Sequence, residues 1–209
     1  MAAAARVVLV HGAATTPRVW DRVVPLLDGY DVVVPERPRT GSLAAETAWL
    51  ASVAASAWVV AISGGATLGL ALAASGTPLA GAVLHEPAVG SLLPGLLAPI
   101  ASAYAASGTA GLGSALYGPS WTPAMAGGVD EATTAAELAM FRSFEPSGAT
   151  PAAGRVLVTW GADSPAVRRE AAEALVPLGY PVRALPGAAH FAAYDAPTAL
   201  AAAVRDWIG

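Results

Sequence analysis

The sequence contains no cysteine, which excludes disulfide bonds, thiolate metal sites and a cysteine nucleophile. Charged residues are scarce as well, at 12% of the 209 residues, and the formal net charge is −4. Because Lys and Arg form no cluster that could neutralise phosphates, neither nucleic acid nor an anionic membrane is an expected partner. Hydrophobic residues reach 55%, which is typical of a folded chain. We expect residues 1–209 to form a single domain.

Apolar runs of the length that targeting signals or membrane spans require are also missing. The N-terminal segment has only four apolar residues between Arg6 and His11, too few for the core of a signal peptide, so we expect a cytoplasmic protein. A membrane span over Trp58–Ser75 is the alternative to a buried strand and helix. Ser63, Gly64 and Gly65 lie in the middle of that segment, which favours the buried strand and helix.

Short apolar runs alternate with helical patterns along most of the chain. The expected strands are Arg6–Val10, Tyr30–Val34, Trp58–Ile62, Ala80–Leu84, Val156–Trp160 and Val182–Leu185. The expected helices between and after them are Pro17–Leu27, Gly64–Ala74, Pro165–Leu175 and Pro197–Trp207. This alternation predicts an α/β fold with a mostly parallel sheet and helices on both faces. Ligands then bind at the carboxyl ends of the strands.

The stretch from about residue 90 to 150 breaks this alternation. Gly, Pro, Ser and Ala dominate it, with weak helical patterns near Leu93–Tyr104 and Glu131–Phe144. We interpret it as a short helical cap inserted over the pocket, within the same domain.

Ser63 has the surroundings of a catalytic nucleophile. It follows the expected strand Trp58–Ile62 and precedes the expected helix, with Ala61 two residues before it and Gly65 two residues after it. A nucleophile on a sharp turn between strand and helix needs small neighbours, because its backbone is strained and crowded. The sequence has Ala at the first of these positions, where the commoner motif Gly-x-Ser-x-Gly has Gly.

His190 is the candidate general base. It lies in the segment Leu185-Pro-Gly-Ala-Ala-His-Phe191, in a loop after the last expected strand. The nucleophile precedes the base in the chain, which is the order that a Ser–His pair takes on this type of sheet.

Two backbone amides are candidates for an oxyanion hole. Ala13 follows the first strand in the segment His11-Gly12-Ala13-Ala14, and Gly64 begins the helix after Ser63, where the helix dipole also favours a negative oxygen. We expect His11 itself to be structural.

With these pieces in place, the chain resembles the α/β-hydrolase superfamily along nearly its whole length. The resemblance rests on the His-Gly segment at His11, the turn at Ser63, the cap insertion, the strand ending at Gly161, and the Pro-Gly-x-x-His segment that ends at His190. It implies the α/β-hydrolase fold and a Ser-His-acid mechanism.

The resemblance leaves two candidates for the acid. Family members usually carry it as Gly-x-x-Asp after the strand before the last, but here Gly161-Ala-Asp163-Ser164 puts Ser164 at that position. Glu86 follows an earlier strand, as the acid does in the haloalkane dehalogenase branch, and is the only formal charge between Thr47 and Val129. Glu86 and Asp163 both remain candidates at this point, with Asp195 a more distant one. We expect His85 to be an exposed loop residue.

The function that these residues predict is hydrolysis of an ester, thioester or related acyl bond in a small, apolar or moderately polar molecule. No metal and no organic cofactor is expected. Two alternatives stay open: a C–C bond hydrolase, lyase or cyclase of a biosynthetic pathway on the same scaffold, and a non-catalytic protein that binds small molecules in the pocket.

Overall fold

A computed structural model describes residues 4–209 and contains a six-stranded sheet in the order β2-β1-β3-β4-β5-β6, in which every neighbouring pair is parallel. The strands are β1 (Arg6–Val10), β2 (Asp31–Val33), β3 (Trp58–Ile62), β4 (Gly81–His85), β5 (Arg155–Gly161) and β6 (Val182–Leu185). Every residue of the central strands β3 and β4 is buried, as their unbroken apolar sequences predict. The expected α/β-hydrolase fold, with a parallel sheet at its centre, is confirmed.

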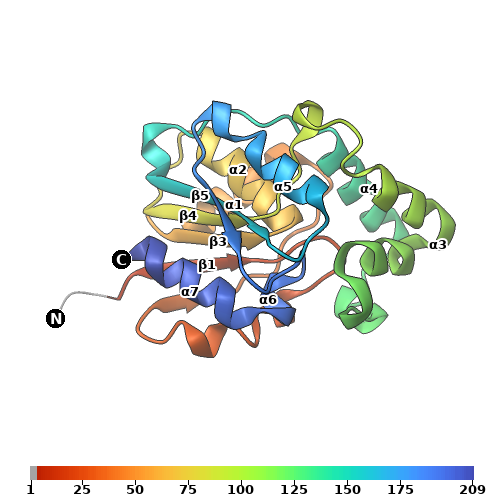
Figure 1. The fold of residues 1–209 in the computed structure, drawn as a ribbon, viewed down its shortest axis with the longest axis horizontal. Helices are drawn as coiled ribbons and strands as arrows, with labels where there is room; N and C mark the ends of the chain where they lie inside the picture. The colour runs from red at the N-terminus through yellow and green to blue at the C-terminus, as the bar shows by residue number, and fades with distance from the viewer. Residues whose placement is uncertain (1–3) are drawn as a thin grey trace.

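Helices cover both faces of the sheet (Figure 1). On one face lie α1 (Leu43–Ala54), α2 (Gly64–Ala74) and α5 (Ala166–Glu173), and on the other lies α7 (Pro197–Ile208), preceded by the short α6 (Ala192–Asp195). The connections that contain α1, α2 and α5 all move along the sheet in the same direction, so right-handed crossovers put these three helices on one face. The direction changes between β1 and β3, which is where a ligand site is expected in an open α/β sheet.

The expected helix Pro17–Leu27 is wrong in detail. The structure has two short 3₁₀ turns there, Pro17–Trp20 and Val24–Leu26. Pro25 has no backbone N–H and its ring crowds the preceding turn, so an α-helix cannot run through this segment.

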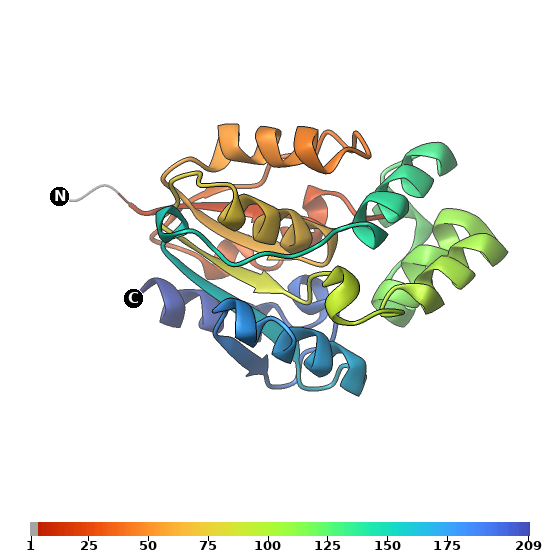
Figure 2. The same ribbon diagram turned by 90° about the horizontal axis from the view of Figure 1, so that it is seen from above.

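Most of the segment from residue 90 to 150, which we call the cap, lies beyond the carboxyl ends of the strands, and its last residues return along α2 (Figure 2), where the Thr150 amide donates to the Ala73 carbonyl at 2.9 Å. It contains α3 (Ala98–Tyr117) and α4 (Glu131–Arg142). The expected helix Leu93–Tyr104 therefore begins and ends too early. α3 continues through a kink at Ser107 and Gly108, where the Glu131 carboxylate accepts a hydrogen bond from the Thr109 amide at 3.0 Å.

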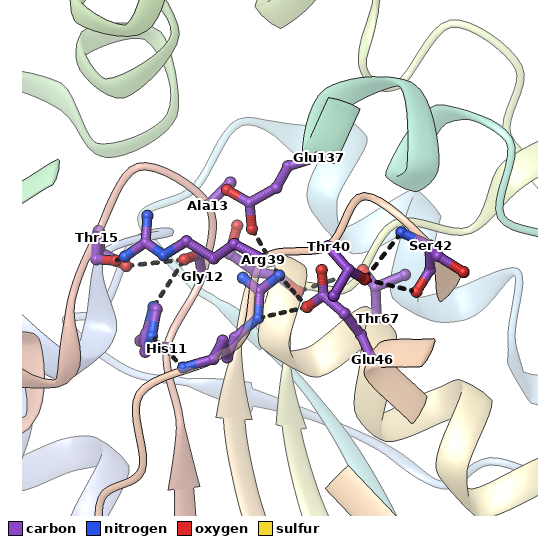
Figure 3. Close-up of polar contacts among 12 residues, drawn as sticks. His11, Gly12, Ala13, Thr15, Arg39, Thr40, Ser42, Glu46, Thr67 and Glu137 are labelled. Atoms are coloured by element: carbon purple, nitrogen blue, oxygen red, sulfur yellow. Dashed lines mark hydrogen bonds and ion pairs between the residues drawn. The ribbon is translucent and has the colours of Figure 1, made fainter. Parts of the chain in front are cut away.

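Three buried charges join the cap to the sheet domain. The guanidinium of Arg37, in the loop after β2, donates to Glu46 of α1 and to Glu137 of α4, and each contact is 2.6 Å at its shortest. All three side chains are fully buried. Figure 3 shows Glu137 extending from the cap toward Glu46. This arrangement fixes the position of α4 over the sheet.

Within residues 4–209, no helix combines the length and apolar character needed to cross a membrane.

Candidate active site

Ser63 occupies a strained turn between β3 and α2. Its backbone has φ 54° and ψ −125°, in the left-handed half of conformational space that residues other than glycine seldom adopt. A Cβ atom at Gly65 would lie 2.4 Å from the carbonyl oxygen of Val10, so only glycine allows α2 to pack this close to β1. The turn projects the Ser63 hydroxyl from the carboxyl edge of the sheet into a pocket.

His190 lies next to Ser63 although 127 positions separate them in the sequence. Its Nε2 is 3.0 Å from Ser63 Oγ, and its ring stacks on that of Tyr117, with 5.5 Å between the ring centroids. Burial, and then the positive charge of Arg168, lower the pKa of His190 to about 4, against the opposing effect of Glu86. The imidazole is therefore neutral at pH 7 and free to accept a proton.

Glu86 is the carboxylate that the structure brings to His190. Its Oε2 accepts a hydrogen bond from His190 Nδ1 at 2.7 Å, and its Oε1 accepts from the Gly161 amide at 2.9 Å and from the Ser164 hydroxyl at 2.5 Å. Burial alone would raise the pKa of Glu86, but the hydrogen bond and charge of His190, with smaller effects from His85 and Arg168, hold that pKa well below its ordinary value. Glu86 is thus a buried, ionised acceptor.

Asp163 and Asp195, the other candidates for the acid, are both exposed. The Asp163 backbone amide donates to the Ala188 carbonyl at 2.9 Å, while its neighbour Ser164 turns toward Glu86. The structure therefore does not bring the carboxylate of Asp163 to His190. Ser164 stands at the position where family members usually carry the acid. Its hydroxyl donates a hydrogen bond to Glu86, the carboxylate that contacts His190.

The expectation that His85 is exposed is wrong. The side chain is fully buried, with Nδ1 3.0 Å from Thr159 Oγ1 and Nε2 3.0 Å from the Ala189 carbonyl oxygen. Because Ala189 immediately precedes His190, this contact ties the His190 loop to the sheet. Burial lowers the pKa of His85, so its neutral form donates to Ala189 from Nε2 and accepts from Thr159 at Nδ1.

The amides of Ala13 and Gly64 lie beside each other on one wall of the pocket that contains Ser63. A Cβ atom at Gly64 would lie 3.3 Å from the Ala13 nitrogen. Within residues 4–209, neither amide donates a hydrogen bond to another protein group. Both therefore remain available to a negatively charged oxygen formed at Ser63.

Three side chains hold the loop that carries Ala13. Tyr117 Oη donates to the Ala13 carbonyl at 2.7 Å, and Trp121 Nε1 donates to the Ala14 carbonyl at 2.9 Å. His11 is fully buried, with Nδ1 3.0 Å from the Gly12 carbonyl oxygen (Figure 3), and so has the structural position expected from the sequence. The cap thus supplies two of these three contacts, those of Tyr117 and Trp121.

The pocket at Ser63 is small and lies under the cap without being sealed by it. Its free volume is about 30 Å³, room for only one or two water molecules. Phe141 of α4 lies over Gly64, since a Cβ atom there would meet the aromatic ring at 2.6 Å. A more open groove of about 300 Å³ begins on the other side of Phe141 and shares Ala88, Leu97 and Phe141 with the pocket.

Sequence reasoning missed Tyr117, Ser164 and Arg168 as members of this site. Ser164 had a usable signal, because it occupies the position of the usual acid. Tyr117 and Arg168 had none. Tyr117 stacks on His190 from α3 of the cap, and Arg168 lines the pocket from α5, so both positions depend on how these helices pack. Within residues 4–209, no group of three His, Asp or Glu side chains is arranged to hold a metal ion.

Comparisons with known proteins identify the family and the fold. Residues 7–203 match the Alpha/beta hydrolase family. Among solved structures, a hydrolase from Pseudomonas aeruginosa PA01 superimposes with a TM-score of 0.76 and 17% identity, over 99% of this chain and 90% of that one. NosK from Streptomyces actuosus gives a TM-score of 0.69 and 23% identity, over 98% and 97% of the two chains.

The enol-lactonase from Burkholderia xenovorans LB400 gives a TM-score of 0.75 and 19% identity, over 99% of this chain and 92% of that one. No curated protein matches the sequence. The family match covers nearly the whole chain and includes every residue of the site described above. The chain belongs to the alpha/beta hydrolase family.

Proposed function

We propose that the protein is a serine hydrolase that cleaves an ester, thioester or related acyl bond. Membership of the family supports a hydrolytic reaction in general. The observation that supports the serine mechanism is the continuous hydrogen-bonded chain from Ser63 Oγ through the His190 ring to Glu86, with 3.0 Å and 2.7 Å between successive partners. This is the geometry that a hydroxyl nucleophile, its base and an orienting acid require.

In the first step, Ser63 Oγ attacks the carbonyl carbon and its proton moves to His190 Nε2. The negative oxygen of the tetrahedral intermediate then accepts hydrogen bonds from the amides of Ala13 and Gly64. When the intermediate collapses, the bond to the leaving group breaks and His190 returns the proton to that group. Water attacks the acyl-Ser63 ester by the same route, which releases the acid and restores Ser63.

Glu86 keeps His190 in the form that carries its proton on Nδ1, so that Nε2 faces Ser63 as an acceptor. It also stabilises the imidazolium that forms during each proton transfer. The substrate we propose is a small, largely apolar molecule, because most side chains around Ser63 are apolar. They are Ala88, Leu97, Ile100, Leu112, Leu116, Leu138 and Phe141.

The test is reaction with a fluorophosphonate probe, together with hydrolysis of 4-nitrophenyl esters of increasing chain length. The wild-type protein should be labelled and should hydrolyse short esters, while Ser63→Ala and His190→Ala should lose both properties. Ser52→Ala removes an exposed hydroxyl on α1 and is the matched control that should behave as the wild type does.

Circular dichroism of each variant checks that the fold is kept. A folded wild-type protein that neither reacts with the probe nor hydrolyses any ester would contradict the proposal. Labelling that persists in Ser63→Ala would contradict the choice of nucleophile.

A further inference from the structure

Arg168 is a buried cation in a largely apolar pocket, where the other charged side chain is Glu86. It belongs to α5, its side chain is only 10% exposed, and it lines the same pocket as Ser63 and the amides of Ala13 and Gly64. A charged side chain loses much of its hydration in such a place and is retained there only with a partner or a task. Burial lowers the pKa of Arg168, and Glu86 only partly opposes that effect.

The contact between Arg168 and Glu86 uses little of the guanidinium. Arg168 Nε lies 3.5 Å from Glu86 Oε2, longer than a hydrogen bond of ordinary length. Glu86 already accepts hydrogen bonds from His190, Gly161 and Ser164. An arginine placed only to neutralise this carboxylate would pair with it through two parallel N–H groups.

The two terminal nitrogens of Arg168 donate no hydrogen bond to any group in residues 4–209. Some polar side-chain atoms, such as Arg37 Nη1, are buried from solvent and have no hydrogen-bond partner. The two terminal nitrogens of Arg168 are not among these buried atoms. These N–H groups are therefore accessible, in a side chain that lines the pocket. They are free to donate to water or to an acceptor of a bound ligand.

We propose that Arg168 binds a carboxylate of the substrate, close to the bond that Ser63 attacks. The planar fork of the guanidinium matches a carboxylate through paired hydrogen bonds. The small free volume at Ser63 limits this anionic part to a short group, and the larger part of the substrate extends past Phe141 into the neighbouring groove. This inference rests on the proposed hydrolase function and adds the substrate class: a short-chain ester that carries a free carboxylate.

The experiment compares esters that differ only in charge. Monoethyl malonate, succinate and glutarate carry the carboxylate, and the ethyl esters of the corresponding half-amides are their neutral counterparts. For the wild type, we expect kcat/KM to be at least about 10-fold higher for the best anionic ester than for its half-amide. In Arg168→Gln the ratio of kcat/KM for the anionic ester to kcat/KM for its half-amide should fall by about 10- to 100-fold, the usual range for loss of a charged hydrogen-bonded pair, because any effect that Arg168 has through Glu86 and His190 slows both esters and cancels in the ratio.

Arg169→Gln is the matched control. Arg169 is the next residue on α5, is 55% exposed and pairs with Glu173, so its loss should leave both ester series unchanged. Arg168→Lys keeps the charge without the planar fork and should fall between wild type and Arg168→Gln for the anionic esters. If Arg168→Gln does not fold, Arg168→Lys and Arg168→Met take its place in the comparison.

Two results would overturn the inference while leaving the hydrolase intact. One is a wild-type enzyme that hydrolyses half-amides and anionic esters equally well. The other is a variant that slows both series by the same factor, which would mean that Arg168 acts only through Glu86 and His190.

Calorimetry of glutarate binding to Ser63→Ala requires no turnover. It therefore tests the carboxylate site separately from the hydrolase proposal. Binding that is lost in Ser63→Ala/Arg168→Gln supports the carboxylate site even if no ester is cleaved. Absence of binding to Ser63→Ala, or equal binding to both proteins, contradicts it.

Discussion

At the scale of single residues, the carboxylate that contacts His190 follows a different strand from the one after which family members usually carry the acid. Glu86 follows β4 and reaches His190, whereas Ser164, at the usual position after β5, donates to Glu86. Glu86 and Ser164 thus hold each other in place, and the Gly161 amide donates a further hydrogen bond to Glu86. Glu86 adopts φ 48°, a strained conformation that this network maintains.

We expect Glu86→Gln to lower kcat for ester hydrolysis by about 10³- to 10⁴-fold, because the amide neither fixes the His190 tautomer nor stabilises its charged form. Asp163→Asn is the matched control and should retain wild-type kcat, since Asp163 is exposed and away from the ring. Steady-state kinetics on a short ester measure both. Equal losses in the two variants, or a loss in Asp163→Asn alone, would show that Glu86 is not the acid.

The pH dependence of activity follows from the charges that face His190. In the proposed mechanism His190 accepts the proton in its neutral form. We therefore expect kcat/KM to stay high above the pKa of His190 and to fall as the pH drops through about 4. Arg168 lowers this pKa, and therefore Arg168→Gln should move the acid limb to higher pH. Glu86→Gln should move it to lower pH, because the carboxylate raises the pKa of His190.

Rates measured between pH 3.5 and 8, with the fold checked by circular dichroism at each pH, test these shifts. An acid limb near pH 6.5 in the wild type would mean that burial does not lower the pKa of His190 as described.

At the scale of helices and loops, the cluster of Arg37, Glu46 and Glu137 decides where the cap lies. Arg37 and its neighbour Arg39 belong to the loop that follows β2. Arg39 donates to the Thr15 carbonyl and pairs with Glu36. Burial raises the pKa of Glu137, against the opposing charge of Arg37.

Removing Arg37 should destabilise the protein far more than removing the charge of Glu137. Arg37→Met leaves two buried carboxylates without a partner and should cost about 3 to 5 kcal/mol in the free energy of unfolding. Glu137→Gln keeps an acceptor for Arg37, which retains Glu46, and should cost less than about 2 kcal/mol. Urea denaturation of the two variants gives the comparison, and similar losses would argue against a shared cluster.

At the scale of the whole molecule, all three histidines of the sequence are buried in the structure. Burial lowers the pKa of each of them, His11, His85 and His190. The unfolded chain binds protons at these positions below about pH 6.5, whereas the folded protein does so only at lower pH. The free energy of unfolding should therefore decrease as the pH falls below 6.5.

For His190 alone, a folded pKa of about 4 corresponds to about 3 kcal/mol of stability that is present above pH 6.5 and lost between pH 6.5 and 4. Glu86 adds a further loss below its ordinary pKa of 4.5, because its folded pKa lies lower still. Urea unfolding at pH 8, 6.5 and 5 measures the effect, and His190→Asn should show a weaker dependence on pH. A stability that is constant over this range would contradict the burial of the histidines.

The sequence by itself determined the sheet, the turn at Ser63 and the place of His190 in the loop after the last strand. Strands and tight turns leave local patterns: an apolar run of five residues, small neighbours around a strained serine, and a glycine where two backbones meet. The tertiary structure alone decided which carboxylate reaches His190, how deeply His85 is buried and where Arg168 points. Those outcomes depend on contacts between residues far apart in the chain, which no local pattern encodes.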